Sequence, residues 1–257
     1  MPRKPSGGQQ ETVLALLDAA GRSKNEVPLR RELVQQGSQR EPTPGPLRDL
    51  VRRHDERALD LYLLLRAAAS ADPWDVKRDA RIWGRAIGLA ADADGGRAAV
   101  SKTWARLEST YCLVRRERSG RLARVFVLHE AGSGEPYSYP REGYFKLPFA
   151  YWTDEEAWYV SLSFAAKATL LVALSLRPPF ALPAERAPAW YGLSADTVDR
   201  GLRELRRAGL LSRSFTEVEN WLSPTGKTTQ YKFALQPPFA RTARKPVARG
   251  HLRAVGT

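Results

Sequence analysis

The sequence predicts a mainly α-helical protein with small β-hairpins, an α+β fold arranged as two successive domains. Its 257 residues, 43% of them hydrophobic, suit two small cores better than one large core. An apolar stripe at i, i+4 and i+7, typical of one helical face, occurs twice, and each time two short alternating runs typical of strands follow. The stripes are Val100, Trp104 and Leu107, and then Val198, Leu202 and Leu205.

Residues 1–46 are expected to be a flexible N-terminal extension. Residues 1–9 are polar, which favours disorder. A short helix is expected over residues 12–20. Residues 37–46 have the Gly- and Pro-rich composition of a linker.

The first predicted domain spans residues 47–130. Three helices are expected, over residues 47–71, 78–89 and 97–110, and Pro73 ends the first of them. Two strands, 113–118 and 122–129, alternate around Ser119-Gly120, which is a tight-turn signal.

A linker over residues 131–143 leads into the second predicted domain, residues 144–236. Residues 144–158 read as a lead-in strand or arm. Helices are expected over 163–176, 183–191 and 194–208, where Ser194 is an N-cap and Gly209 a helix stop. Strands over 210–215 and 229–235 would close the domain around a long loop with a basic tip. Residues 237–257 form a basic tail that is expected to be mobile.

The sequences of the two predicted domains match each other when the first is shifted along the chain. The third helices match at a shift of 98 positions, and this register continues into the hairpin, where Leu113 meets Leu211. The first helices match at a shift of 111. In the first copy Tyr111 occupies the place of Gly209, which leaves the geometry of that turn open.

The charge balance indicates a polyanionic partner. The chain carries 41 Lys and Arg against 28 Asp and Glu, a formal net charge of +13, and such a surplus favours nucleic acid through counterion release. A well-solvated basic surface is the alternative. The single cysteine, Cys112, allows no internal disulfide and reads most simply as a small buried residue. No stretch approaches the ~20 apolar residues of a membrane span. We therefore expect a cytoplasmic, nucleoid-associated protein.

The sequence predicts no enzyme, no metal site and no cofactor. The three histidines, His54, His129 and His251, lie far apart and have no metal-ligand spacing. No phosphate-binding Gly-rich loop is present. The acidic run Asp154-Glu155-Glu156 is better explained as a solvated helix start.

Residues 193–211 carry a resemblance to a known family. They read Leu-Ser-Ala-Asp-Thr-Val-Asp-Arg-Gly-Leu-Arg-Glu-Leu-Arg-Arg-Ala-Gly-Leu-Leu. This segment resembles the core of the widespread bacterial winged helix-turn-helix, and both halves of the chain look like such domains. The pair, together with Tyr-Phe-Lys-Leu-Pro at 144–148, is also similar to plasmid replication initiators.

The resemblance implies that each third helix enters the major groove of double-stranded DNA and each hairpin contacts the backbone. Arg200 would read guanine, Thr197 would contact a thymine methyl or a phosphate, and Arg203 would face the groove. Arg206 and Arg207 would bind phosphates. The remaining expected contacts are Arg97, Ser101, Lys102 and Arg106 in the first copy, with Arg118, Arg121 and Lys227 in the hairpins.

The sequence also offers alternatives to these contacts. Arg200 with Glu204, and Arg203 with Asp199, could form ion pairs along the helix. Four tryptophans are expected in the core or at a domain interface rather than as base-stacking platforms: Trp83, Trp104, Trp190 and Trp221.

We expect sequence-specific DNA binding, in the role of a transcriptional regulator. The alternatives are a replication initiator or maintenance protein of a plasmid or integrated element, and a protein-interaction module that buries its third helix against a partner. The expected partners are double-stranded DNA, a second copy in a homodimer, and the replication or transcription machinery. The first copy, with Tyr111 in its turn, is the candidate for dimerisation.

Overall fold

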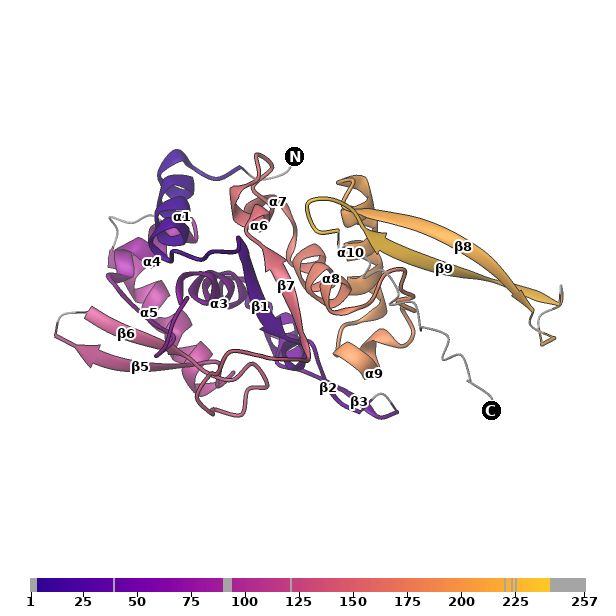
Figure 1. The fold of residues 1–257 in the computed structure, drawn as a ribbon, viewed down its shortest axis with the longest axis horizontal. Helices are drawn as coiled ribbons and strands as arrows, with labels where there is room; N and C mark the ends of the chain where they lie inside the picture. Colours follow the sequence, from indigo (N-terminus) through magenta and orange to yellow (C-terminus); the bar gives the residue numbers. More distant parts are fainter. Residues whose placement is uncertain are drawn as a thin grey trace, which may run out of the picture.

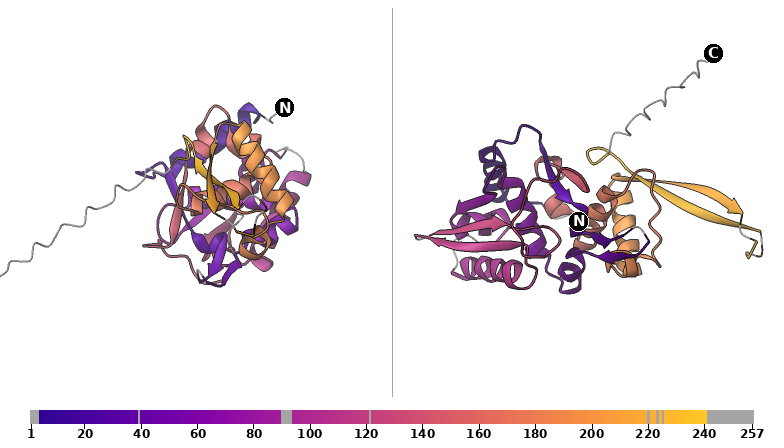
Figure 2. Two further views of the ribbon diagram at one scale, coloured as in Figure 1. Left: turned by 90° about the vertical axis from the view of Figure 1, so that its right-hand side faces the viewer. Right: turned by 60° about the horizontal axis from the view of Figure 1, so that its bottom comes forward.

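The computed structural model describes residues 4–38, 40–89, 94–120, 122–219, 221–222, 224 and 226–240. The chain is mixed α+β, with 42% helix, 23% strand and small antiparallel sheets, so the predicted α+β class is confirmed. Figure 1 shows the helices gathered around β1 and β7, while the β8–β9 hairpin projects away from them. The right-hand view in Figure 2 shows the same projection.

The predicted flexible extension is wrong for the residues described. Helix α1 (Gly7–Ala19) begins at the N-cap Ser6 and buries Val13, Leu16 and Leu17. Strand β1 (Glu26–Arg30) pairs antiparallel with β7 (Tyr144–Pro148). After η1 (Arg31–Leu33), strands β2 (Gln35–Gly37) and β3 (Pro42–Pro44) form a hairpin that contacts α9. The partner strand of β1 lies more than a hundred residues along the chain, which no local pattern reveals.

The first module comprises residues 56–127. The predicted helix over 47–71 is interrupted: α2 (Leu47–Arg52) ends before His54, which adopts a left-handed φ of 53°, and α3 (Glu56–Ala68) follows. Next come β4 (Asp75–Arg78), α4 (Ala80–Ala86), α5 (Asp94–Ser109), β5 (Val114–Ser119) and β6 (Leu122–Val127). Strand β4 is a further correction, since its pairing with β6 makes a three-stranded sheet of order β4-β6-β5.

The second module comprises residues 164–235 and follows two short helices, α6 (Ala150–Thr153) and α7 (Trp158–Ser161). Its helices are α8 (Phe164–Ser175), α9 (Ala187–Tyr191) and α10 (Ala195–Arg207), close to the predicted ranges. Strands β8 (Leu211–Glu219) and β9 (Lys227–Leu235) are longer than predicted and are buried only at their base. Phe180 forms a β-bridge to Phe233 there.

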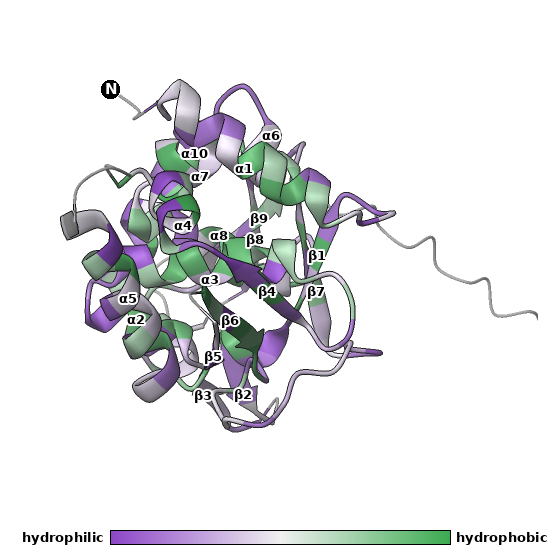
Figure 3. Ribbon diagram, turned by 90° about the vertical axis from the view of Figure 1, so that its left-hand side faces the viewer, coloured by the Kyte–Doolittle hydropathy of each residue, from purple (hydrophilic) through white to green (hydrophobic). Residues whose placement is uncertain are grey.

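The two modules share one continuous core. In Figure 3, α3 and α8 carry the hydrophobic colour at the centre of the molecule. Lys167 of α8 joins them by bonding Glu56 and Asp60 of α3. The buried side chains of both modules form one cluster, where the sequence suggested two small cores.

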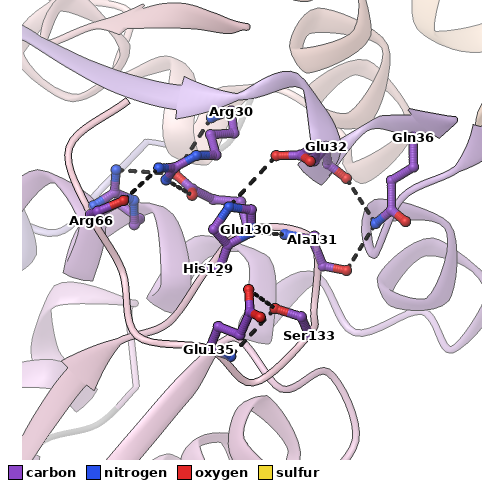
Figure 4. A network of polar contacts seen from close by, with 10 residues as sticks. Arg30, Glu32, Gln36, Arg66, His129, Glu130, Ala131, Ser133 and Glu135 are labelled. Atoms are coloured by element: carbon purple, nitrogen blue, oxygen red, sulfur yellow. Dashed lines mark hydrogen bonds and ion pairs between the residues drawn. The ribbon is translucent and has the colours of Figure 1, made fainter. Parts of the chain in front are cut away.

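The predicted linker over 131–143 is also wrong as a purely flexible segment. Leu128 forms a bridge to Pro136, and Tyr137 is buried. Glu130, just before this segment, has a fully buried side chain that binds Arg30 at 2.9 Å and Arg66 at 3.2 Å. Arg66, also fully buried, lies over the ring of Tyr137. Figure 4 shows both guanidinium groups pointing to Glu130.

Candidate nucleic-acid interface

Helix α10 has an apolar face and a basic face. The Thr197 backbone N–H donates to the Ser194 side chain at 3.1 Å, so the predicted N-cap is confirmed. Val198, Leu202 and Leu205 are buried, as predicted. Gly209, with a φ of 73°, ends the helix in the left-handed conformation that glycine accommodates best. The opposite face therefore carries exposed arginines: Arg200, Arg203, Arg206 and Arg207.

Two of these arginines have partners on the same helix. Arg203 binds Asp199 at 2.9 Å, as predicted. Arg200 binds Asp196 at 3.0 Å and not Glu204, so that prediction is wrong. Both pairs are more than half exposed, and exposed ion pairs contribute little to stability, so a phosphate or base can replace either acid at low cost.

Glu204 is occupied elsewhere: it accepts bonds from the backbone N–H and the hydroxyl of Ser163, the N-cap of α8. Arg206 and Arg207 form no ion pair with any described residue. Thr197 is half-buried, and its hydroxyl lies 2.8 Å from that of Ser194. The arginines at the end of α10 are therefore available to bind a phosphate, while those earlier in the helix must first give up a weak ion pair.

Helix α5 is arranged in a similar way. Val100, Trp104 and Leu107 are buried, which confirms the predicted stripe. Three predicted contact residues, Arg97, Ser101 and Lys102, are exposed.

Arg106 differs from the other predicted contacts because it has a structural role. It donates to both carboxylate oxygens of Asp55, at 2.6 and 2.8 Å, and Tyr111 donates to the same carboxylate. Burial opposes ionisation of Asp55, but the bonds from Arg106 and Tyr111 outweigh it and hold the pKa of Asp55 below its ordinary value. The structure therefore places Arg106 against Asp55, the N-cap of α3, with 41% of its side chain exposed.

The structure corrects the alignment of the two modules. Arg106 and Glu204, which lie 98 positions apart, contact the N-caps Asp55 and Ser163, which lie 108 apart. The first helices therefore match at a shift of 108, not 111. Sequence periodicity could not separate these shifts because they differ by about one helical turn.

The turn after the third helix differs in length between the modules. The Leu113 N–H bonds to Leu107, whereas the Leu210 N–H bonds to Leu205, so Leu113 corresponds to Leu210 and not to Leu211. The extra residue in the first turn is accommodated by Cys112, which takes a left-handed φ of 50° and is half-buried rather than buried. Tyr111 is therefore not the left-handed residue.

The predicted contact residues of the two hairpins differ in their surroundings. Arg118 is exposed at the end of β5, and Arg121 lies outside the described residues. Lys227 is exposed but binds Glu217 at 3.1 Å. The predicted basic tip of the second hairpin carries Glu217 and Glu219 on β8, so in its described part it is not basic.

The four tryptophans divide in a way that the sequence did not show. Trp83 and Trp104 are buried and Trp190 is partly buried, but Trp221 is 82% exposed, so that prediction is wrong. The start of the predicted tail is anchored by the buried Phe239, which packs on Trp158. Residues 241–257 lie outside the described part.

Sequence reasoning missed a basic cleft beside the junction of the modules. The cleft has a volume of about 1340 Å³ and is bounded by α1, the N-terminal end of α3 and the C-terminal end of α4. The acids in its lining are paired, Asp55 with Arg106 and both Glu56 and Asp60 with Lys167. The remaining basic residues of the lining give the cleft a positive excess: Lys4, Arg53, Arg57 and Arg85.

An ion triad centred on the buried Lys167 joins α3 and α8 at this junction. The Lys167 side chain is only 2% exposed, and its Nζ lies 2.8 Å from Glu56 and 2.8 Å from Asp60. Burial raises the pKa of Asp60 to about 6, and Lys167 opposes that rise. Because α5 contacts the N-terminus of α3 and α10 that of α8, both basic helices flank this junction.

Replacing Lys167 with methionine is expected to raise the pKa of Asp60 beyond about 6, because the ammonium is the charge that opposes burial. A carboxyl group whose pKa is raised by folding destabilises the folded state when it is ionised. Relative to the wild type, the variant should therefore lose most stability above about pH 6 and regain part of it at lower pH. Urea unfolding on either side of the Asp60 pKa measures this. Lys146→Met, which removes a surface pair with Glu26, is the control. An equal loss at both pH values would contradict the assignment.

Comparisons with known proteins give no relative of this chain, so its function is assigned from the geometry of the site. No protein-family model matches the chain, and neither the curated proteins nor the solved structures give a significant match. Among the residues described, no helix has the length and apolar character needed to cross a bilayer.

Proposed function

We propose that the chain is a sequence-specific double-stranded DNA-binding protein built from two winged helix-turn-helix units. The first module runs helix, strand, helix, helix, strand, strand, with the sheet order β4-β6-β5. In the second module, the Phe180–Phe233 bridge stands where the first module has β4. This order is the one expected of a winged helix.

The observation that carries the proposal is that the two third helices, α5 and α10, are arranged in the same way. Each buries its apolar stripe against the first helix of its module and leaves a polar, basic face exposed. That is the arrangement in which a helix enters the major groove. The net charge of +13 and the basic cleft beside the junction provide for phosphate contacts.

The rigid junction favours a composite DNA site. Because the Lys167 triad and the β1–β7 pair fix one module against the other, a single chain would read two half-sites at constant spacing. A transcriptional regulator is the role we propose. Genome-wide mapping of bound sites separates it from a replication initiator, since the sites would lie at promoters in the first case and as repeats at an origin in the second.

Replacing Arg200 with alanine is expected to weaken binding to the preferred site by about 1–3 kcal/mol and to relax specificity there. Arg207→Ala should weaken binding to all sequences about equally, since a phosphate contact carries no sequence information. Fluorescence anisotropy on the selected site and on a scrambled duplex measures both effects. Arg141, exposed on the connection before β7, provides the control variant.

Salt dependence tests the proposal against a protein-interaction role. Affinity for DNA should fall about a thousandfold between 50 and 200 mM salt if six or more phosphates are contacted. Unchanged affinity in Arg200→Ala, or binding that ignores salt, would exclude α10 as the reading helix.

A further inference from the structure

The β8–β9 hairpin, here called the ribbon, concentrates the exposed apolar surface of the molecule. Seven large hydrophobic side chains are exposed in the described part of the chain, and five of them belong to the ribbon and its tip. Such a concentration of exposed apolar side chains on one element indicates an interaction surface. The five are Phe215, Val218, Trp221, Leu222 and Tyr231.

The ribbon also has an unpaired strand edge whose hydrogen-bonding pattern can be deduced. The backbone N–H and C=O of Phe233 bond to Phe180, so they point away from β8. Phe233 is therefore a non-hydrogen-bonded partner of Arg213, and the pattern alternates along the ladder. It follows that the N–H and C=O groups of Arg213, Phe215 and Glu217 point to the outer edge of β8. No strand in the described chain pairs with that edge.

We propose that two copies of the chain associate by antiparallel pairing of their β8 edges about a twofold axis at Phe215. Phe215 then lies opposite the partner's Phe215, and Arg213 opposite the partner's Glu217. The twofold axis generates the second Arg–Glu pair. All three positions direct their backbone groups to the edge, so each forms a hydrogen-bonded pair.

Charge and apolar complementarity together select this register. An axis at Arg213 would oppose two arginines, and an axis at Glu217 would oppose two glutamates, both of which are unfavourable. An axis one residue beyond Phe215 would place that ring against the partner's Glu217. Only the axis at Phe215 joins opposite charges and matches the aromatic rings.

The association would complete a surface that the monomer leaves open. The rings of Phe215 and Tyr231 are paired across β8 and β9, so the four strands would carry a continuous row of four aromatic rings. A two-stranded ribbon alone is only marginally stable, whereas a four-stranded sheet with an apolar face can be stable. Each ribbon tip would also lie alongside the base of the other ribbon, which covers part of the apolar tip.

Acidic side chains argue against DNA as the occupant of this surface. Glu217 and Glu219 flank the apolar tip, and the nearby Lys227 is already paired with Glu217. A phosphate backbone would be repelled there, whereas a second copy supplies Arg213. The proposal does not depend on DNA binding by α10.

Charge exchange tests the register directly. Sedimentation velocity of the full chain without DNA should show a dimer. Arg213→Glu and Glu217→Arg should each raise the dimer dissociation constant at least tenfold, because each places like charges opposite one another. The double variant should restore it, since it re-forms both pairs with their signs exchanged.

Several results would overturn the proposal. A monomer at every concentration would do so, as would a dimer that neither single variant weakens, or single losses that the double variant fails to restore. Reduced DNA affinity in the single variants with no change in sedimentation would instead assign the ribbon to DNA.

Discussion

Replacing Glu130 with alanine is expected to lower the free energy of unfolding by about 3–5 kcal/mol. Glu130 is fully buried and forms ion pairs with both Arg30 and Arg66, and Arg66 is itself fully buried. Without the carboxylate, the Arg66 guanidinium retains the hydrogen bond from its Nη2 to the carbonyl of Pro28 at 2.7 Å, which supplies no opposite charge. An uncompensated buried charge is costly because water no longer solvates it.

Urea unfolding followed by circular dichroism measures the loss. Glu135→Ala is the matched control, since Glu135 is an exposed acid in the same connection and should change stability by no more than about 0.5 kcal/mol. The double variant Arg66→Met with Glu130→Leu should recover much of the loss, because an apolar pair can replace a buried ion pair. Wild-type stability in Glu130→Ala would show that the network contributes nothing.

Replacing Gly201 with alanine is expected to cost about 1–3 kcal/mol and to weaken DNA binding as well. Gly201 lies where α10 crosses α8, and a Cβ there would overlap the Thr169 hydroxyl and lie 2.7 Å from the Ala165 carbonyl oxygen. The backbone carbonyl cannot turn away as a side chain can. The alanine must therefore push α10 off α8, which would move the basic face.

Gly95→Ala provides the comparison in the other third helix, because nothing lies within 4 Å of an added Cβ there. Alanine is the better helix former, so this variant should be neutral or slightly stabilising. Thermal unfolding and anisotropy on the same duplex measure both effects. If Gly201→Ala bound DNA as the wild type does, the close packing of α10 on α8 would not set the position of the reading helix.

The sequence predicted the elements that are determined locally. Both third helices and both hairpins appear near their expected positions, since an apolar stripe, a cap and a tight turn act within one segment. Strand β1 was missed because its partner β7 is far along the chain. Strand β4 was missed because only its pairing with β6 distinguishes it from a helix start.

The candidate site was predictable in part for the same reason. The exposed arginines of α10 follow from the helix period, whereas Arg85 is brought beside Arg53 and Arg57 only in the folded chain. Two signals were present but not used. Arg66 and Lys167 are lone charges within apolar runs, and each proved to be a buried cation with acidic partners.

The pairing of β1 with β7 has a consequence for biosynthesis. Arg30 pairs with Tyr144, so after Arg30 has been made the ribosome must add 114 residues before its partner exists. At about 5–20 residues per second this takes on the order of ten seconds. During that interval the nascent chain exposes Val27 and Leu29, which are fully buried in the finished protein. A chaperone that binds short apolar stretches would therefore find its target here, early in translation.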